Sequence, residues 1–169
     1  MSGAQSDPVG AAAGIIVSVG HIVGVAQSKS ASPLMGAWKV AEVTRTGARA
    51  GKTTSPQPGL YIFTAGHYAV ETVNSDAPRP DLPPAETRTD KQVAEAFGPF
   101  TANAGSYEIK GNEVTTHVMV AKNPGTMKDG SFQLVTFRLE GKNTLWLTQK
   151  SNSNGPAQNP TTIKLKRIE

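Results

Sequence analysis

The chain has 169 residues with 17 Gly, 12 Pro and no Cys, and 17 basic against 13 acidic side chains give it a net charge of +4. The absence of Cys excludes disulfides, thiolate metal sites and a cysteine nucleophile. Because Lys and Arg are scattered rather than gathered in a basic stripe, we expect no nucleic-acid partner. The length suits one folded domain.

The first 33 residues are predicted to be an extension of that domain, which begins at residue 34. Residues 11–26, AAAGIIVSVGHIVGVA, form an apolar run of signal-peptide length that is too short for an integral membrane span. Gly24-Val25-Ala26 offers a small-residue cleavage site after Ala26, although residues 1–10 contain no Lys or Arg. We expect export, periplasmic or secreted. The alternative is an uncleaved extension on a cytoplasmic protein.

Residues 59–73, GLYIFTAGHYAVETV, are predicted to form a β-hairpin with Ala65-Gly66 as its loop. Thr64 then faces His67, and pairing can be counted outward from these two residues. One face of the hairpin becomes aromatic and apolar, and we expect it to be buried. This face carries Tyr61, Phe63, Tyr68, Val70 and Thr72.

Six further strands are expected, at residues 38–46, 105–110, 113–121, 131–139, 144–150 and 161–168. The Pro-rich segment 74–89 cannot supply the donors of a sheet interior, so it is expected at the surface. It leads to a short helix at residues 90–97 with Thr89 or Asp90 as N-cap. Eight strands in all favour an all-β, up-and-down antiparallel barrel.

Two later hairpins fix further side-chain faces. The loop Gly111-Asn112 places Tyr107, Val114 and Thr116 on one face and His117 on the other. A four-residue loop at 140–143 pairs Leu139 with Thr144 and makes Phe137 face Trp146.

The lengths of the connections distinguish the two ends of the barrel. Connections after the second, fourth and sixth strands are tight and the others are long, so one end is closed and the other open. The start of the first strand and the end of the last strand both fall at the closed end. Lys166 or Arg167 is therefore expected to contact the indole of Trp38. The Pro-rich segment and its helix fall at the open end, where they are placed to act as a lid.

Gly36-Ala37-Trp38 resembles the G-x-W signature that opens the first strand of lipocalins, and a basic residue in the last strand is similar to the Arg that packs on that Trp. A more specific resemblance, to the bacterial and fungal lipocalin-like domain family, covers residue 34 to the C-terminus. It rests on segments 59–68, 96–107, 111–118 and 137–147. The resemblance implies a barrel that contains a cavity and specifies no ligand.

This chain departs from the family pattern at two places. Thr116-His117 stands where the family usually has paired histidines, and Val135-Thr136 replaces the Arg that usually precedes the Phe of the sixth strand. Any polar function of those missing residues is therefore not expected here.

Two functions follow from the barrel. The first is binding or carriage of a small, mostly apolar molecule in the cavity. The candidate ligand contacts, for which core packing or solvent exposure is the alternative, are Tyr61, Phe63, Tyr68, Val70, His117, Phe137, Arg138 and Trp146. The second is a cofactor-free isomerase, cyclase or hydratase with His117 or Glu42 as acid or base.

No metal or cofactor is expected. The three histidines, His21, His67 and His117, lie in different segments without metal-ligand spacing. No pattern specifies a catalytic residue, and the oligomeric state is left open.

Overall fold

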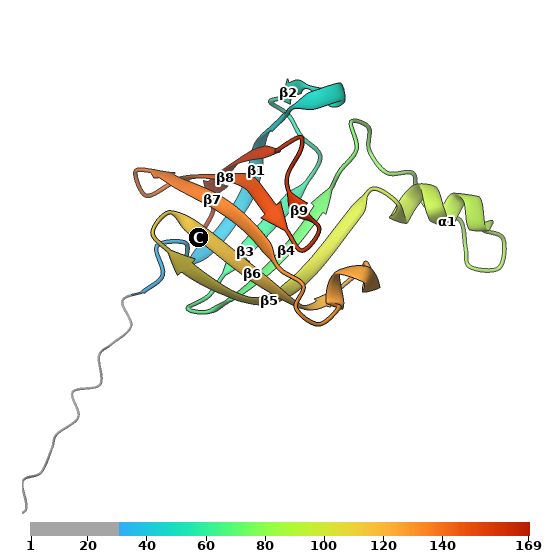
Figure 1. The fold of residues 1–169 in the computed structure, drawn as a ribbon. Helices are drawn as coiled ribbons and strands as arrows, with labels where there is room; N and C mark the ends of the chain where they lie inside the picture. Colours follow the sequence, from blue (N-terminus) through green and yellow to red (C-terminus); the bar gives the residue numbers. More distant parts are fainter. Residues whose placement is uncertain (1–30) are drawn as a thin grey trace, which may run out of the picture. The chain divides into compact units, whose positions relative to one another are not determined.

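The computed structural model describes residues 31–169, in which one antiparallel sheet closes on itself (Figure 1). The closed sheet contains β1 (Gly36–Arg45), β3 (Gly59–Phe63), β4 (His67–Val73), β5 (Phe100–Lys110), β6 (Glu113–Ala121), β7 (Gln133–Glu140), β8 (Thr144–Asn152) and β10 (Thr162–Arg167). Neighbouring strands follow chain order, and β10 pairs with both β8 and β1, which completes the barrel. The predicted eight-stranded up-and-down barrel is confirmed.

Two short strands lie outside this circuit. β2 (Gly51–Thr53) pairs with β1, and β9 (Gly155–Pro156) pairs with β8. The loop after β1 also contains the 3-10 helix η1 (Gly47–Arg49), and a second one, η2 (Pro124–Met127), follows β6. The predicted signal peptide and most of the linker lie outside the described residues, so export stays a prediction.

The hairpin of β3 and β4 has the predicted register. Tyr61 pairs with Val70 and Phe63 with Tyr68, and the Thr64 amide donates to the His67 carbonyl at 2.8 Å. The β5–β6 hairpin likewise pairs Tyr107 with Thr116. The inner faces of both hairpins meet in one core.

The predicted start of β5 is wrong by five residues. The strand begins at Phe100, because residues 100–104 pair with β4; their sequence, FTANA, alternates, but the polar residues Thr101 and Asn103 are the ones that line the cavity inside the barrel. The register between β5 and β6 shifts after Ala104, and the backbone of β6 approaches Gly105 closely there. A Cβ on Gly105 would overlap the His117 carbonyl, so glycine permits this irregularity.

The predicted register of β7 and β8 is also wrong by one residue. Leu139 pairs with Leu145 and Phe137 with Leu147, while Arg138 pairs with Trp146. The connecting turn therefore has three residues rather than four. A one-residue slip moves a side chain to the other face of a sheet. Trp146 consequently lies outside the barrel and does not face Phe137.

A buried tryptophan closes one end of the barrel. Trp38 and Leu34 are fully buried, and the indole Nε1 of Trp38 donates to the Leu34 carbonyl at 2.8 Å. The Arg167 guanidinium lies 4.0 Å from the centroid of the Trp38 ring, so of the two cations that the connection lengths predicted, Lys166 or Arg167, it is Arg167 that contacts the indole. Arg167 also donates to the Lys142 carbonyl at 2.7 Å and to the Met35 carbonyl. These contacts join β1, the β7–β8 turn and the end of β10.

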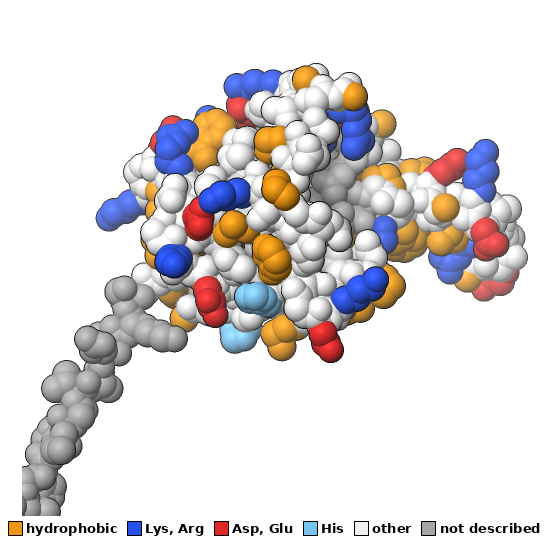
Figure 2. Space-filling view, in the orientation of Figure 1, with side chains coloured by type: hydrophobic (Ala, Val, Ile, Leu, Met, Phe, Trp, Pro, Cys, Tyr) orange, Lys and Arg blue, Asp and Glu red, His pale blue; other side chains and the backbone are white. Residues whose placement is uncertain are grey.

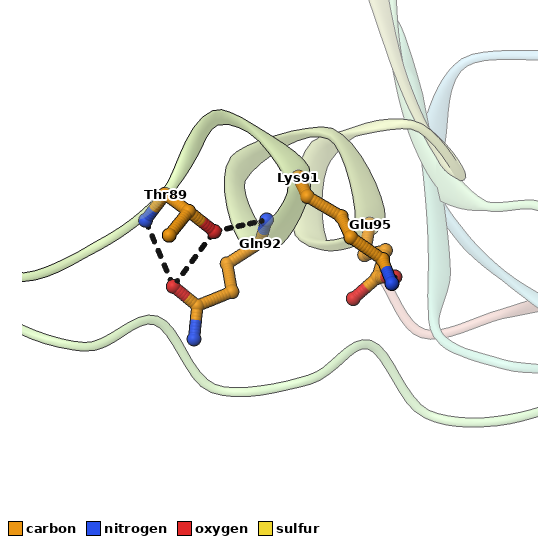
Figure 3. A network of polar contacts seen from close by, with 4 residues as sticks. All are labelled: Thr89, Lys91, Gln92 and Glu95. Atoms are coloured by element: carbon orange, nitrogen blue, oxygen red, sulfur yellow. Dashed lines mark hydrogen bonds and ion pairs between the residues drawn. The ribbon is translucent and has the colours of Figure 1, made fainter.

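The helix α1 (Asp90–Phe97) occupies the predicted residues and is stabilised by its own N-terminal residues (Figure 3). The Gln92 amide donates to Thr89 Oγ1 at 3.3 Å, and the Thr89 amide donates to Gln92 Oε1 at 2.8 Å, which is a capping box. Lys91 and Glu95 form an ion pair of 3.9 Å one turn apart. In Figure 1 the helix projects to one side of the barrel.

Two cations hold the C-terminal end of α1. Lys122, just after β6, donates to the carbonyls of Phe97 and, at 2.8 Å, Phe100. Arg79 donates to the Ala96 carbonyl at 3.3 Å, and its guanidinium lies 4.8 Å from the Phe100 ring centroid. Positive charge beside the free carbonyls of a helix end is stabilising.

We expect Trp38→Phe to lower the free energy of unfolding by about 2–4 kcal/mol, because it leaves a void and removes the donor to Leu34. The matched change Trp146→Phe, on the outer face, is expected to cost less than about 1.5 kcal/mol, since its ring contacts exposed cations. Urea denaturation measures both. Equal losses would contradict the assignment of Trp38 as the plug of the closed end.

We expect Lys122→Met to accelerate amide hydrogen exchange in residues 90–100 by about two- to fivefold, because the helix end loses its cation. The urea midpoint should not change, since α1 lies outside the barrel core. Lys110→Met, at an exposed position of the opposite end, is the control. Unchanged exchange in the Lys122 variant would show that these contacts do not hold the helix.

Candidate functional site

A cavity of about 310 Å³ lies inside the barrel towards its open end. Its deeper wall is formed by buried core residues, among them Phe63, Tyr68, Val114 and Leu147. Its outer part is polar and carries only amide and hydroxyl groups. The polar lining residues are Thr72, Asn74, Thr101, Asn103, Thr116, Gln133, Gln149 and Thr161.

Within residues 31–169, the residues that line the cavity include no Asp, Glu, Lys, Arg or His. Two tyrosines are its ionisable groups. Burial raises the pKa of Tyr61 to about 12. Burial also raises the pKa of Tyr68, and the nearby Thr116 hydroxyl partly offsets this increase. Both phenols are therefore neutral near pH 7, and the cavity wall is uncharged.

The two buried tyrosines of the core differ in how their hydroxyls are satisfied. The Tyr107 hydroxyl donates to the Thr64 carbonyl at 2.6 Å and is hydrogen-bonded to Ser32 Oγ at 2.6 Å. The Tyr68 hydroxyl is buried at the cavity and has no partner with hydrogen-bonding geometry among the described residues. A buried hydroxyl without a partner is unfavourable, so this group is available to a ligand.

The predicted ligand contacts separate into three groups, in the cavity, in the core and on the outer face. Tyr61, Phe63, Tyr68 and Val70 line the cavity together. Phe137 packs against the hydrophobic core through the inner face of β7, outside the cavity lining.

The other three predicted contacts lie on the outer face, which corrects their assignment to the cavity. Arg138 and Lys164 lie over the Trp146 ring at 5.3 and 4.8 Å from its centroid, and Arg138 also forms an ion pair with Glu140. For Trp146 the physical reason is the one-residue difference in the β7–β8 register. Arg138 and His117 are the strand neighbours of Phe137 and Thr116, whose side chains point inward, and successive strand residues point to opposite faces.

His117 is exposed and pairs with Ser106, which pairs in turn with His67. Figure 2 shows histidine side chains gathered at one place on the surface of the barrel. The solvent-exposed alternative for His117 therefore holds.

Glu42, the second candidate acid or base, is also directed away from the cavity. Its carboxylate forms an ion pair with Lys52 of β2 at 2.9 Å, and its side chain is 11% exposed. Neither proposed catalytic group lines the cavity. Within residues 31–169 there is also no cluster of three or more His, Cys, Asp or Glu that could hold a metal ion.

The helix does not cover the cavity as a lid. No residue between 75 and 99 belongs to the cavity lining. The Pro-rich segment and α1 instead enclose a separate hollow of about 480 Å³ beside the loop before β3, lined by Pro58, Arg79, Leu82 and Phe97 among others. The predicted position at the open end is correct, whereas the covering role is absent in this structure.

Sequence analysis missed the polar residues around the cavity. Asn103 pairs with Val70 and Thr101 with Thr72. Because paired residues lie on the same face of a sheet, both point inward as Val70 and Thr72 do. Extending β5 to Phe100 would have identified both. The inward direction of Gln133 and Gln149 follows from the β6–β7 and β7–β8 pairings. The register shift within the β7–β8 pair makes these pairings hard to predict by counting from the turns.

The protein is therefore an antiparallel barrel of eight strands with a cavity inside it. Residues 35–168 match the family model described as a lipocalin-like domain. The chain therefore belongs to the lipocalin-like domain family, whose fold is associated with ligand binding in general. No match was found among curated proteins.

Three solved structures illustrate the distant similarity of this chain to known proteins. A lipocalin-like protein from Bacteroides uniformis is 14% identical, with a TM-score of 0.43 over 81% of this chain and 100% of that chain. An uncharacterized protein from Bacteroides eggerthii is 12% identical, with a TM-score of 0.42 over 79% and 98%. A redesigned β-barrel is 14% identical, with a TM-score of 0.41 over 81% and 93%.

Among the described residues, no helix has the length and apolar character required to cross a bilayer.

We expect Tyr107→Phe to lower the free energy of unfolding by about 1–3 kcal/mol, because the change removes the buried hydroxyl that is hydrogen-bonded to the Thr64 carbonyl and to Ser32 Oγ. Tyr68→Phe is the matched comparison and should change stability by less than about 0.5 kcal/mol or increase it, since its hydroxyl has no partner to lose. Urea denaturation of the two variants gives the values. A Tyr68→Phe loss as large as that of Tyr107→Phe would mean that the Tyr68 hydroxyl is already satisfied.

Proposed function

We propose that this protein binds a small, mostly apolar, molecule inside its barrel. The observation that carries the proposal is the uncharged cavity, with an apolar wall and a polar outer part. Its volume of about 310 Å³ equals the liquid volume of about ten water molecules. This volume is at the lower end of the range for small-molecule sites, so the part of the ligand inside the cavity is a short acyl chain or a small ring system.

Burial of apolar surface drives binding in such a site, at about 25 cal/mol per Å². Phe63, Val114 and Leu147 supply that surface at the inner part of the cavity. The ligand is oriented by the few polar groups around it. Tyr68 is foremost among these, because its hydroxyl gains a partner without losing one.

A reaction in the cavity has no comparable support. General acid and base catalysis needs a titratable group within hydrogen-bonding reach of the substrate. The lining offers only phenols whose pKa values are raised by burial. Binding is therefore the function that this site favours.

Filling the cavity should weaken binding. Val135 lines the cavity and is only partly buried, so Val135→Phe has room to place its ring inside. We expect this variant to bind the neutral fluorophore N-phenylnaphthylamine about tenfold more weakly, equivalent to about 1.4 kcal/mol. Fluorescence titration of the purified protein measures the affinity.

Ile62→Phe is the matched control, because Ile62 is 40% exposed on the outer face of β3. It should bind the fluorophore as the unaltered protein does. Failure of the unaltered protein to bind the fluorophore, or equal binding by both variants, would count against a ligand inside the barrel.

A further inference from the structure

A second hollow adjoins the barrel cavity at its open end. It has a volume of about 570 Å³ and lies beside the segment that contains η1 and β2. We call it the mouth. Four residues line both the mouth and the cavity, namely Thr72, Asn74, Thr161 and Ile163. A ligand that fills the cavity can therefore extend into the mouth.

The side of the mouth nearest the barrel is partly apolar. Val40 and Val43 of β1 line it together with Ile163 of β10. The apolar surface thus continues from the cavity into the mouth, which suits a ligand whose apolar part spans the boundary.

The mouth differs from the cavity because it is charged. Arg45 and Arg49 line it, against a single carboxylate, Asp76. The Arg45–Asp76 contact is long, at 3.9 Å, and the Asp76 side chain is 92% exposed. Arg49 has no ion-pair partner within residues 31–169. The mouth therefore has one cation more than its own carboxylate can neutralise.

We propose that the ligand is an amphipathic carboxylate, with its apolar body in the cavity and its carboxylate at Arg45 and Arg49 in the mouth. This inference rests on the proposed function. The planar guanidinium group presents paired donors that match a carboxylate. A carboxylate placed deeper, in the cavity, would lose its hydration without gaining a charged partner, because only neutral groups surround it there. The mouth is therefore its favoured position.

The size and charge of the site limit the ligand further. An excess of one positive charge favours a monoanion over a dianion. A cationic ligand would meet two guanidinium groups at the only charged part of the site, so it is disfavoured.

A matched pair of competitors separates the head group from the apolar body. Decanoate and decanol have the same chain length and differ in charge. Each is titrated against the full chain with N-phenylnaphthylamine bound. We expect decanoate to displace the fluorophore about five- to twentyfold more effectively than decanol, because charged hydrogen bonds add to the same apolar burial. Salt should reduce this ratio, since it screens exposed charges.

Removing the two cations should remove the preference. In Arg45→Gln/Arg49→Gln we expect the ratio of decanoate to decanol affinity to approach one. The ratio is taken within each variant, so a general loss of affinity cancels. Arg49→Glu is a second variant at an exposed position, where folding is insensitive to the change, and it should make decanoate the weaker competitor.

Lys39→Gln/Lys110→Gln is the control, because it removes the same net charge at exposed positions outside the cavity and the mouth. It should keep the preference for decanoate. A ratio of one in the unaltered protein, or a preference that survives in Arg45→Gln/Arg49→Gln, would overturn the head-group assignment. Both outcomes leave binding of the neutral fluorophore intact, whereas loss of that binding would overturn the proposed function itself.

Discussion

The contact between Trp38 and Arg167 is the constraint on which the barrel depends. The indole is fully buried at the closed end, where β1 pairs with β10, and the guanidinium lies 4.0 Å from the centroid of its ring. Because the same Arg side chain binds carbonyls of the β7–β8 turn and the segment before β1, one side chain joins three parts of the closed end. Any hollow inside the barrel must then open at the opposite end.

The interior is divided by polarity along the barrel axis. Phe63 and Leu147 lie in the packed part, amide and hydroxyl side chains follow towards the open end, and charges appear only in the mouth. This order follows from desolvation, since a charge deep in the barrel would need a partner that the inward positions of the strands do not supply. An uncharged cavity beside a cationic mouth is suited to binding an amphipathic molecule.

The outer face of the barrel carries Trp146, Arg138 and His117, three of the predicted ligand contacts. Trp146 lies between Arg138 and Lys164, so a ring that would be costly to expose is covered by two cations from neighbouring strands. His117 is exposed on β6. Aromatic and ionisable groups often mark binding sites, but the direction of each side chain decides whether it faces the cavity.

The sequence by itself determined the barrel, the hairpin face with Tyr61 and Tyr68, and the helix with Thr89 or Asp90 as its cap. These depend on short-range signals: strand alternation, turn residues and capping side chains. The approach of Lys166 or Arg167 to Trp38 followed from the alternation of tight and long connections around the barrel. Tertiary structure alone decided the direction of Trp146 and the identity of the polar lining. A one-residue difference in a turn moves a side chain to the opposite face of the sheet, and a register shift prevents pairs from being counted outward from a turn. Tertiary structure also brought the mouth beside the cavity, since that arrangement requires strands far apart in sequence to meet.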